Sequence, residues 1–101
     1  HLNLIGAFQP HTREVDDETV RRARVVVDTY EGALAEAGDL LIPIRNGTIA
    51  RAHIVADLHE IASGKKIGRN SAEDVTVFKS VGCAVEDLVT AQLVWRAAQY
   101  D

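Results

Sequence analysis

Apolar residues along this chain come in short runs, and polar stretches separate them. The first run, residues 2–5, is broken only by Asn3 and closed by Gly6, which is typical of a strand buried on both faces. Residues 25–27 are three consecutive valines, and this β-branched run predicts a second buried strand. Residues 75–78 predict a third strand. The pattern therefore indicates short strands with other elements between them.

Two short helices are predicted in the first half of the chain. Three acidic residues at 16–18 supply a cap and negative charge for a helix of about two turns. Asp28 with Glu31 three residues later resembles a capping box, and it predicts a helix that passes Leu34 and ends at Gly38.

Two further helices are predicted in the second half. Four apolar residues keep near-helical spacing and predict a helix from a cap at Thr48 to Gly64. They are Ile49, Ile54, Leu58 and Ile61. After a turn at residues 80–82, a long helix is expected over residues 84–98. Its apolar residues cover more than one stripe, so it belongs either in the core or in a subunit interface, and the pattern leaves both open.

Strands that alternate with helices predict parallel pairing through right-handed crossovers, with both faces of the sheet covered. The expected fold class is therefore α/β, half of a doubly wound parallel sheet, with a long C-terminal helix. The chain has no methionine, and His1 directly precedes an expected strand. We therefore expect a fragment of a longer protein.

Composition and charge remove several classes of function. With 101 residues and 47% hydrophobic content, the chain can form one modest core. A net charge of −4 and scattered basic residues give no surface that would follow a nucleic-acid backbone. No apolar run approaches the roughly 18–20 residues that cross a membrane. The lone Cys83 excludes an internal disulfide and is compatible with a reducing compartment, so the cytoplasm is the expected location.

The residues that follow the strands are the candidate ligand sites, because open parallel sheets bind ligands beyond the carboxyl ends of their strands. Gly6 could let a flat ring lie against the backbone, or it could only end the strand. Phe8 belongs either beneath the loop, which is slightly favoured, or in a pocket wall. The turn at residues 80–82 could bind an anion or a carboxamide through its free N–H groups; alternatively, Ser80 or Gly82 simply caps the next helix.

Other polar residues are interpreted as structural. Asp28 follows a strand as a ribose-binding acid does, but capping is the favoured role because no glycine-rich loop precedes it. Cys83 near a helix start could be nucleophilic, yet inert burial is expected because no histidine is positioned as its base. Four further groups lack the spacing of a metal site and are expected to form a solvated face. They are His53, Asp57, His59 and Glu60.

Several motifs follow one another along nearly the whole chain. They are Ile5-Gly6-Ala7, Arg13-Glu14-Val15-Asp16, the strand from Arg24 to Asp28, Glu36-Ala37-Gly38-Asp39-Leu40, Gly68-Arg69, and Phe78-Lys79-Ser80-Val81-Gly82 followed by Glu86-Asp87. Together and in this order they resemble the ornithine cyclodeaminase and mu-crystallin family.

This resemblance implies a Rossmann-type domain that binds NAD(P)H, in a homodimer of a longer chain that takes a small imino acid or amino acid. Residues 1–82 would form the nicotinamide side of that domain, and residues 83–101 the helix that returns to the dimerisation and substrate domain. The positions implied to contact the cofactor are Gly6, Ala7, Phe8 and Ser80. Those implied to contact the substrate are Phe8 and Val81. The phosphate loop and the residues for the substrate carboxylate would lie outside this segment, so it is expected to be inactive alone, and no catalytic residue is assigned.

Two positions distinguish this chain from the ornithine cyclodeaminases of the family. By this resemblance, those enzymes have an aspartate at the position of Phe8 and a lysine at the position of Thr12. Phenylalanine cannot accept a proton, so the sequence is more similar to the cyclic ketimine reductases of the family. These reduce Δ1-pyrroline-2-carboxylate and Δ1-piperideine-2-carboxylate to proline and pipecolate. Two alternatives remain: an ornithine cyclodeaminase or alanine dehydrogenase-like enzyme, and a non-catalytic mu-crystallin-like binding protein.

Overall fold

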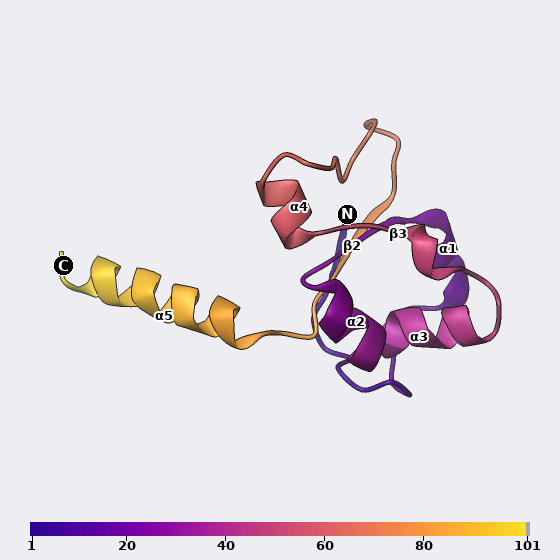
Figure 1. The fold of residues 1–101 in the computed structure, drawn as a ribbon, viewed down its shortest axis with the longest axis horizontal. Coiled ribbons are helices and arrows are strands. Elements are labelled where there is room, and N and C mark those ends of the chain that lie inside the picture. The colour runs from indigo at the N-terminus through magenta and orange to yellow at the C-terminus, as the bar shows by residue number, and fades with distance from the viewer. Residues whose placement is uncertain (101) are drawn as a thin grey trace.

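The computed structural model describes residues 1–100 as a parallel sheet with helices packed against it and a terminal helix that points away (Figure 1). The elements in chain order are β1 (Leu2–Leu4), α1 (Asp17–Arg22), β2 (Arg24–Val27), α2 (Tyr30–Glu36), α3 (Gly38–Arg45), a 3-10 turn (Arg51–His53), β3 (Ile54–Asp57), α4 (Leu58–Ala62), β4 (Thr76–Lys79) and α5 (Ala84–Ala98).

All strand pairs in the sheet are parallel, and the strand order is β1-β4-β2-β3. The last strand of the chain therefore lies between the first and the second. In the register of the sheet, Lys79 at the end of β4 lies beside Leu4 of β1 and Val27 of β2. The carboxyl ends of these three strands consequently form one edge, as the alternation of strands and helices predicts.

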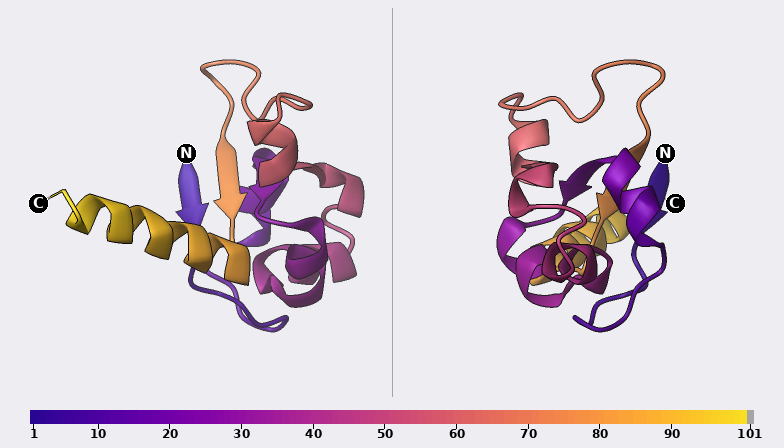
Figure 2. Two further views of the ribbon diagram at one scale, coloured as in Figure 1. Left: turned by 60° about the vertical axis from the view of Figure 1, so that its left-hand side comes forward. Right: turned by 90° about the vertical axis from the view of Figure 1, so that its right-hand side faces the viewer.

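The core lies between one face of the sheet and helices α1 to α3. Alternate strand residues point toward these helices, because side chains alternate between the two faces of a strand. The members of this core are Leu4, Val20, Ala23, Val25, Val27, Ala33, Ala37, Leu40, Ile49, Ile54 and Val77. Figure 2 shows these helices together on one side of the strands and α4 on the other.

The opposite face of the sheet is covered only in part. The first strand was expected to be buried on both faces, and this expectation is wrong. Of the run at residues 2–5, only Leu4 is buried, and Ile5 is 66% exposed. Within the described residues β1 pairs with β4 alone, so its other edge has no neighbouring strand. The apolar run does form a strand, but not one buried on both faces.

Helix α1 begins where the acidic run predicts. The Asp16 side chain accepts a hydrogen bond from the Thr19 N–H, which is the N-cap interaction expected for this residue type. The next helix differs from the prediction, because its N-cap is Thr29, which accepts from the N–H of Gly32, and not Asp28.

Gly38 does not simply end a helix; it begins α3, which the sequence analysis missed. A Cβ atom at this position would lie 1.8 Å from the carbonyl oxygen of Thr12 and 2.6 Å from that of Gln9. The glycine is therefore required by the close approach of the loop after β1.

The helix predicted between Thr48 and Gly64 is wrong. The segment contains a 3-10 turn, strand β3 and the short helix α4. In β3, Ile54 and Ala56 are buried and their neighbours are half-buried, which is the two-residue period of a strand. Asp57 and Glu60 then form a capping box that starts α4.

Helix α5 extends away from the rest of the molecule (Figures 1 and 2). None of its fifteen residues is buried, so it does not belong to the core of this chain. Its N-cap position is Cys83, without a side-chain hydrogen bond, and neither Ser80 nor Gly82 caps it. Among the described residues, no helix is long and apolar enough to cross a membrane.

Candidate site at the carboxyl edge of the sheet

The two strand exits singled out by the sequence lie side by side. The N–H of Ser80 donates to the carbonyl oxygen of Leu4 at 3.0 Å, which joins the end of β4 to the end of β1. Beyond this bond, Ala7 is buried and Phe8 is 60% exposed. Burial of Phe8 beneath the loop, the slightly favoured expectation, is therefore wrong in this chain.

The N–H groups at the β4 exit are already occupied by the carboxylate of Asp28. Its Oδ2 accepts hydrogen bonds from the N–H groups of Val81 and Gly82 at 3.0 and 2.9 Å, and from the Ser80 hydroxyl at 3.0 Å. Its Oδ1 accepts from the N–H of Thr29. One of the two expectations for this turn was that its N–H groups bind an anion. They do, but the anion is the side chain of Asp28 and not a separate ligand. Asp28 thus joins β2 to β4 and is not a helix cap.

This arrangement limits what Ser80 and Val81 offer to a ligand. The Ser80 hydroxyl donates to Asp28 and also accepts from the Gly82 N–H at 3.2 Å, so both functions of that hydroxyl are used. Val81 is half-buried and packs against the core. Gly82 has a φ of 87°, a left-handed backbone that favours glycine at this turn.

A buried charge cluster beneath the two exits was not predicted as a site. Lys79 at the end of β4 is 0% exposed, and its Nζ lies 3.1 Å from Oδ2 of Asp39 and 3.6 Å from Oε2 of Glu14. The other Asp39 oxygen accepts from the N–H groups of Glu14 and Val15. One sequence signal could have indicated it: a lysine on the same strand face as the buried Val77 needs a carboxylate partner.

Gly6 is the point at which this cluster meets the backbone of the first exit. Its N–H donates to Oε1 of Glu14 at 3.0 Å. A Cβ atom at Gly6 would lie 2.5 Å from the same oxygen. The missing side chain therefore leaves room for the Glu14 carboxylate, besides any room it leaves for a ligand.

The polar residues near β3 have structural partners. Asp57 and Glu60 form the capping box of α4, and the ring of His53 donates to the carbonyl oxygen of Val20 at 2.8 Å. The Tyr30 hydroxyl donates to Glu60 at 2.8 Å, and this hydrogen bond is the main cause that lowers the pKa of the Glu60 carboxyl. Burial, and then the same bond, raises the pKa of Tyr30. Within residues 1–100 no three such groups come together as a metal site.

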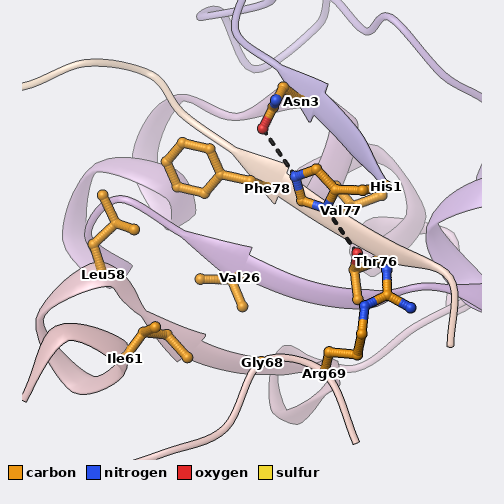
Figure 3. Close-up of a pocket in the computed structure, with 10 residues that line it drawn as sticks. All are labelled: His1, Asn3, Val26, Leu58, Ile61, Gly68, Arg69, Thr76, Val77 and Phe78. Carbon is orange, nitrogen blue, oxygen red and sulfur yellow. Dashed lines mark hydrogen bonds between the residues drawn. The ribbon is translucent and has the colours of Figure 1, made fainter. Parts of the chain in front are cut away.

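A cavity of about 490 Å³ lies elsewhere, on the partly covered face of the sheet (Figure 3). Phe78, Val26, Leu58 and Ile61 provide apolar walls, and His1 at the polar end hydrogen bonds with Thr76. No candidate site residue from the two strand exits lines this cavity.

Cys83, for which burial was expected, is half-buried at the start of α5.

The fold class is thus α/β, with a four-stranded parallel sheet and two neighbouring strand exits that carry Gly6 and Gly82. Residues 1–100 match the sequence profile of the ornithine cyclodeaminase/mu-crystallin family. The chain belongs to this family.

Three relatives show how far the similarity extends. The chain is 43% identical over 99 residues to a Δ1-pyrroline-2-carboxylate reductase of Bacillus cereus, with 97% of this chain and 30% of the relative covered. The structure of Thermococcus litoralis Δ1-pyrroline-2-carboxylate reductase with NADH and L-proline superposes with a TM-score of 0.88 at 46% identity, and covers 97% of this chain and 30% of that one. An archaeal alanine dehydrogenase dimer with bound NAD has a TM-score of 0.82 at 34% identity, with the same coverage. The chain thus spans about 30% of the length of such relatives.

Proposed function

We propose that this chain is the C-terminal segment of an NAD(P)H-dependent reductase of cyclic imino acids, with Δ1-pyrroline-2-carboxylate or Δ1-piperideine-2-carboxylate as substrate. Residues 1–82 supply the nicotinamide side of a dinucleotide-binding domain, and residues 83–101 return to a dimerisation and substrate domain of the same protein. The proposal includes a homodimer and a cytoplasmic location. It is supported by the NADH and L-proline of the Thermococcus litoralis relative.

The observation that carries the proposal is the pairing of the two strand exits, with an exposed aromatic ring beyond them. The bond from Ser80 to Leu4 holds the exits together, and Phe8 projects from the first of them with 60% of its surface exposed. A cofactor ring and a small cyclic substrate need such a pair of surfaces, one of backbone and one of apolar side chain.

The charge at this edge favours one end of a dinucleotide over the other. A phosphate needs free N–H donors, but the donors at residues 81 and 82 already bind the Asp28 carboxylate. A second anion there would be repelled. The residues fit an uncharged or cationic ring, held by the backbone of Gly6 and Ala7 and by Phe8. The nicotinamide would supply the hydride, and the residues of this chain would orient the nicotinamide ring.

Phe8 also bears on the choice of reaction. A cyclic imino acid already contains its C=N bond, so its reduction requires hydride and a proton but no prior loss of ammonia. An apolar ring can form a pocket wall for such a substrate, but it cannot serve as the acid or base of a deamination. We assign Phe8 and Val81 to the substrate side, and Gly6, Ala7, Phe8 and Ser80 to the cofactor side.

A chimera tests this function directly. This chain replaces the matching 30% of the Bacillus cereus reductase, and the product is assayed with Δ1-pyrroline-2-carboxylate, with ornithine, and with pyruvate plus ammonia, each with the appropriate oxidised or reduced cofactor. We expect turnover of the cyclic imine. Turnover of ornithine or pyruvate without turnover of the imine would contradict the proposal. Cofactor binding without any turnover would favour a binding protein.

Two variants at one position sharpen the assay. Phe8→Leu keeps an apolar wall, and Phe8→Asp introduces a carboxylate at the same place. We expect Phe8→Leu to keep most of the imine reduction and Phe8→Asp to lose at least about tenfold in kcat/KM, because a charged group then faces an apolar part of the substrate. Parental activity in both variants would remove Phe8 from the site.

A further inference from the structure

The most unusual side chain of this molecule is the ammonium group of Lys79. It lies on the face of the sheet that packs against α1 to α3, where the same face of β4 carries Val77. Both Lys79 and Asp39 have fully buried side chains, while the Glu14 side chain is 36% exposed. Removing charges from water is costly, and an apolar side chain could fill the same space, so this cluster is not explained by stability alone.

The two carboxylates that meet Lys79 belong to the loop after β1 and to the helix on which that loop rests. Glu14 Oε2 forms an ion pair with Lys79 at 3.6 Å, without a hydrogen bond, and Glu14 Oε1 accepts from the N–H of Gly6. Asp39 Oδ2 forms an ion pair with Lys79 at 3.1 Å, without hydrogen-bond geometry, and Asp39 Oδ1 accepts from the N–H groups of Glu14 and Val15. One end of the loop, Gly6, is therefore connected to the Lys79 ammonium group through Glu14. The other end, Val15, is connected to it through Asp39.

The middle of the same loop also lies against the start of α3. Gly38 leaves no space between its backbone and the carbonyl groups of Gln9 and Thr12. Three points of the loop are thus fixed relative to β4 and α3. Ala7 and Phe8 lie on the segment between two of these points.

We propose that Lys79 is a positioning residue, which acts through Glu14 and Asp39 to hold the loop at residues 6–15 so that Gly6, Ala7 and Phe8 line the carboxyl edge of the sheet. Its role in a reaction rests on the proposed function, but the anchoring itself is a property of this chain. Lys79 has no exposed surface and does not touch the ligand in this assignment.

Hydrogen exchange of the Gly6 amide in the 101-residue chain measures the anchoring without cofactor or substrate. The variants are Glu14→Gln, Glu14→Ala and Lys79→Met, with the Glu14→Gln/Lys79→Met double variant. Matched controls are Glu18→Gln and Lys66→Met, because each removes an exposed member of another ion pair. The amides of residues 25–27 report any general loss of stability.

We expect Glu14→Ala and Lys79→Met each to accelerate exchange at Gly6 by about tenfold or more, while the controls leave it unchanged. The double variant should exchange no faster than Lys79→Met, because both changes break the same connection. Additive effects, or an unchanged Gly6 rate in Lys79→Met, would overturn the proposal. If Lys79→Met does not fold, Glu14→Gln decides: it keeps an oxygen for the Gly6 N–H and loses the charge that faces Lys79, so full protection of Gly6 would overturn the role of the ion pair.

The chimeric reductase then separates anchoring from function. If the parent chimera is active, Glu14→Ala should lower kcat/KM and Glu14→Gln should lower it less, while Glu18→Gln has no effect. An active parent with unchanged kinetics in Glu14→Ala would show that the loop is anchored but does not serve the site. An inactive parent would count against the proposed function and would leave the exchange result as it stands.

Discussion

Apolar side chains are buried in one region of the molecule, the sheet with helices α1 to α3, and exposed in the other, the terminal helix α5. In the first region, Val20, Val25, Val27 and Leu40 have no exposed surface. In α5, Leu88, Leu93 and Trp95 are 57%, 61% and 67% exposed. Both regions are rich in apolar side chains, so composition does not distinguish them; only the first has a second layer to pack against.

The two regions therefore differ in what stabilises them. The sheet and helices α1 to α3 enclose a core and can be stabilised by their own contacts. A helix of fifteen residues with no buried residue gains little from tertiary packing, which normally provides most helical stability. Several large apolar side chains are exposed on α5, and gathered apolar side chains often mark an interaction surface in other proteins.

The largest effect is expected from truncating the same residue type in the two regions. Leu40→Ala removes a fully buried side chain and should lower the free energy of unfolding by about 2–5 kcal/mol. Leu93→Ala should change it by less than about 0.5 kcal/mol, because 61% of this residue is already exposed to solvent. Chemical denaturation of both variants measures the contrast. Equal losses would show that α5 is packed in solution.

A smaller effect is expected at Asp28, which connects the first region to the turn before α5. Asp28→Asn keeps the size of the side chain but replaces an oxygen acceptor with an NH₂ group that faces N–H donors at Val81 and Gly82. We expect a loss of about 1–3 kcal/mol and faster amide exchange at these two residues. Normal exchange at both would mean that the carboxylate does not hold the turn. Asp74→Asn is the control for exchange at residues 81 and 82, because the Asp74 carboxylate also accepts from backbone N–H groups, but from those of Asn70 and Ser71.

The two helix caps should respond in opposite directions. Thr29 accepts from the N–H of Gly32 at the start of α2, so Thr29→Ala should cost about 1 kcal/mol in denaturation experiments. Cys83 makes no such bond at the start of α5. Cys83→Ser supplies a hydroxyl at that N-cap and should raise helicity in circular dichroism without changing the midpoint of core unfolding. A fall in helicity would contradict this view of the α5 terminus.

The smallest effect is expected from protonation of Glu60. The Tyr30 hydroxyl, a backbone N–H at Asp57 and Lys66 all lower its pKa below the ordinary 4.5 in the folded state. This carboxylate therefore stabilises the fold fully above about pH 4.5, and the contribution is lost as the pH falls toward the lowered pKa. Tyr30→Phe should make acid unfolding less steep in this range. An unchanged slope would indicate that the bond does not persist in solution.

Strands β1, β2 and β4 and the first helix could be predicted from the sequence because their signals are local. Consecutive valines formed β2, and Asp16 capped α1. The segment around β3 was misjudged because apolar residues at near-helical spacing outweighed two local signs of a strand and a new helix. Those signs were the β-branched pair Ile54-Val55 and the capping box of Asp57 with Glu60.

The errors within the site have a different origin, since they depend on partners distant in the sequence. Asp28 resembled a helix cap, but its carboxylate binds the Ser80 hydroxyl 52 residues away. Gly38 resembled a helix stop, but the constraint comes from Thr12. The buried cluster around Lys79 combines residues from two elements, α3 and β4, and from the loop after β1. The location of the site at two strand exits could be predicted from topology, while its hydrogen bonds could not.

Within residues 1–100, one side of β1 has no neighbouring strand, and this has a practical consequence. Its main-chain donors and acceptors offer a template to which a strand from a separate polypeptide can add, while β4 fixes the register on the other side. The chain could therefore be used as one component of a split reporter, in which recovery of a signal measures reassembly of the two components.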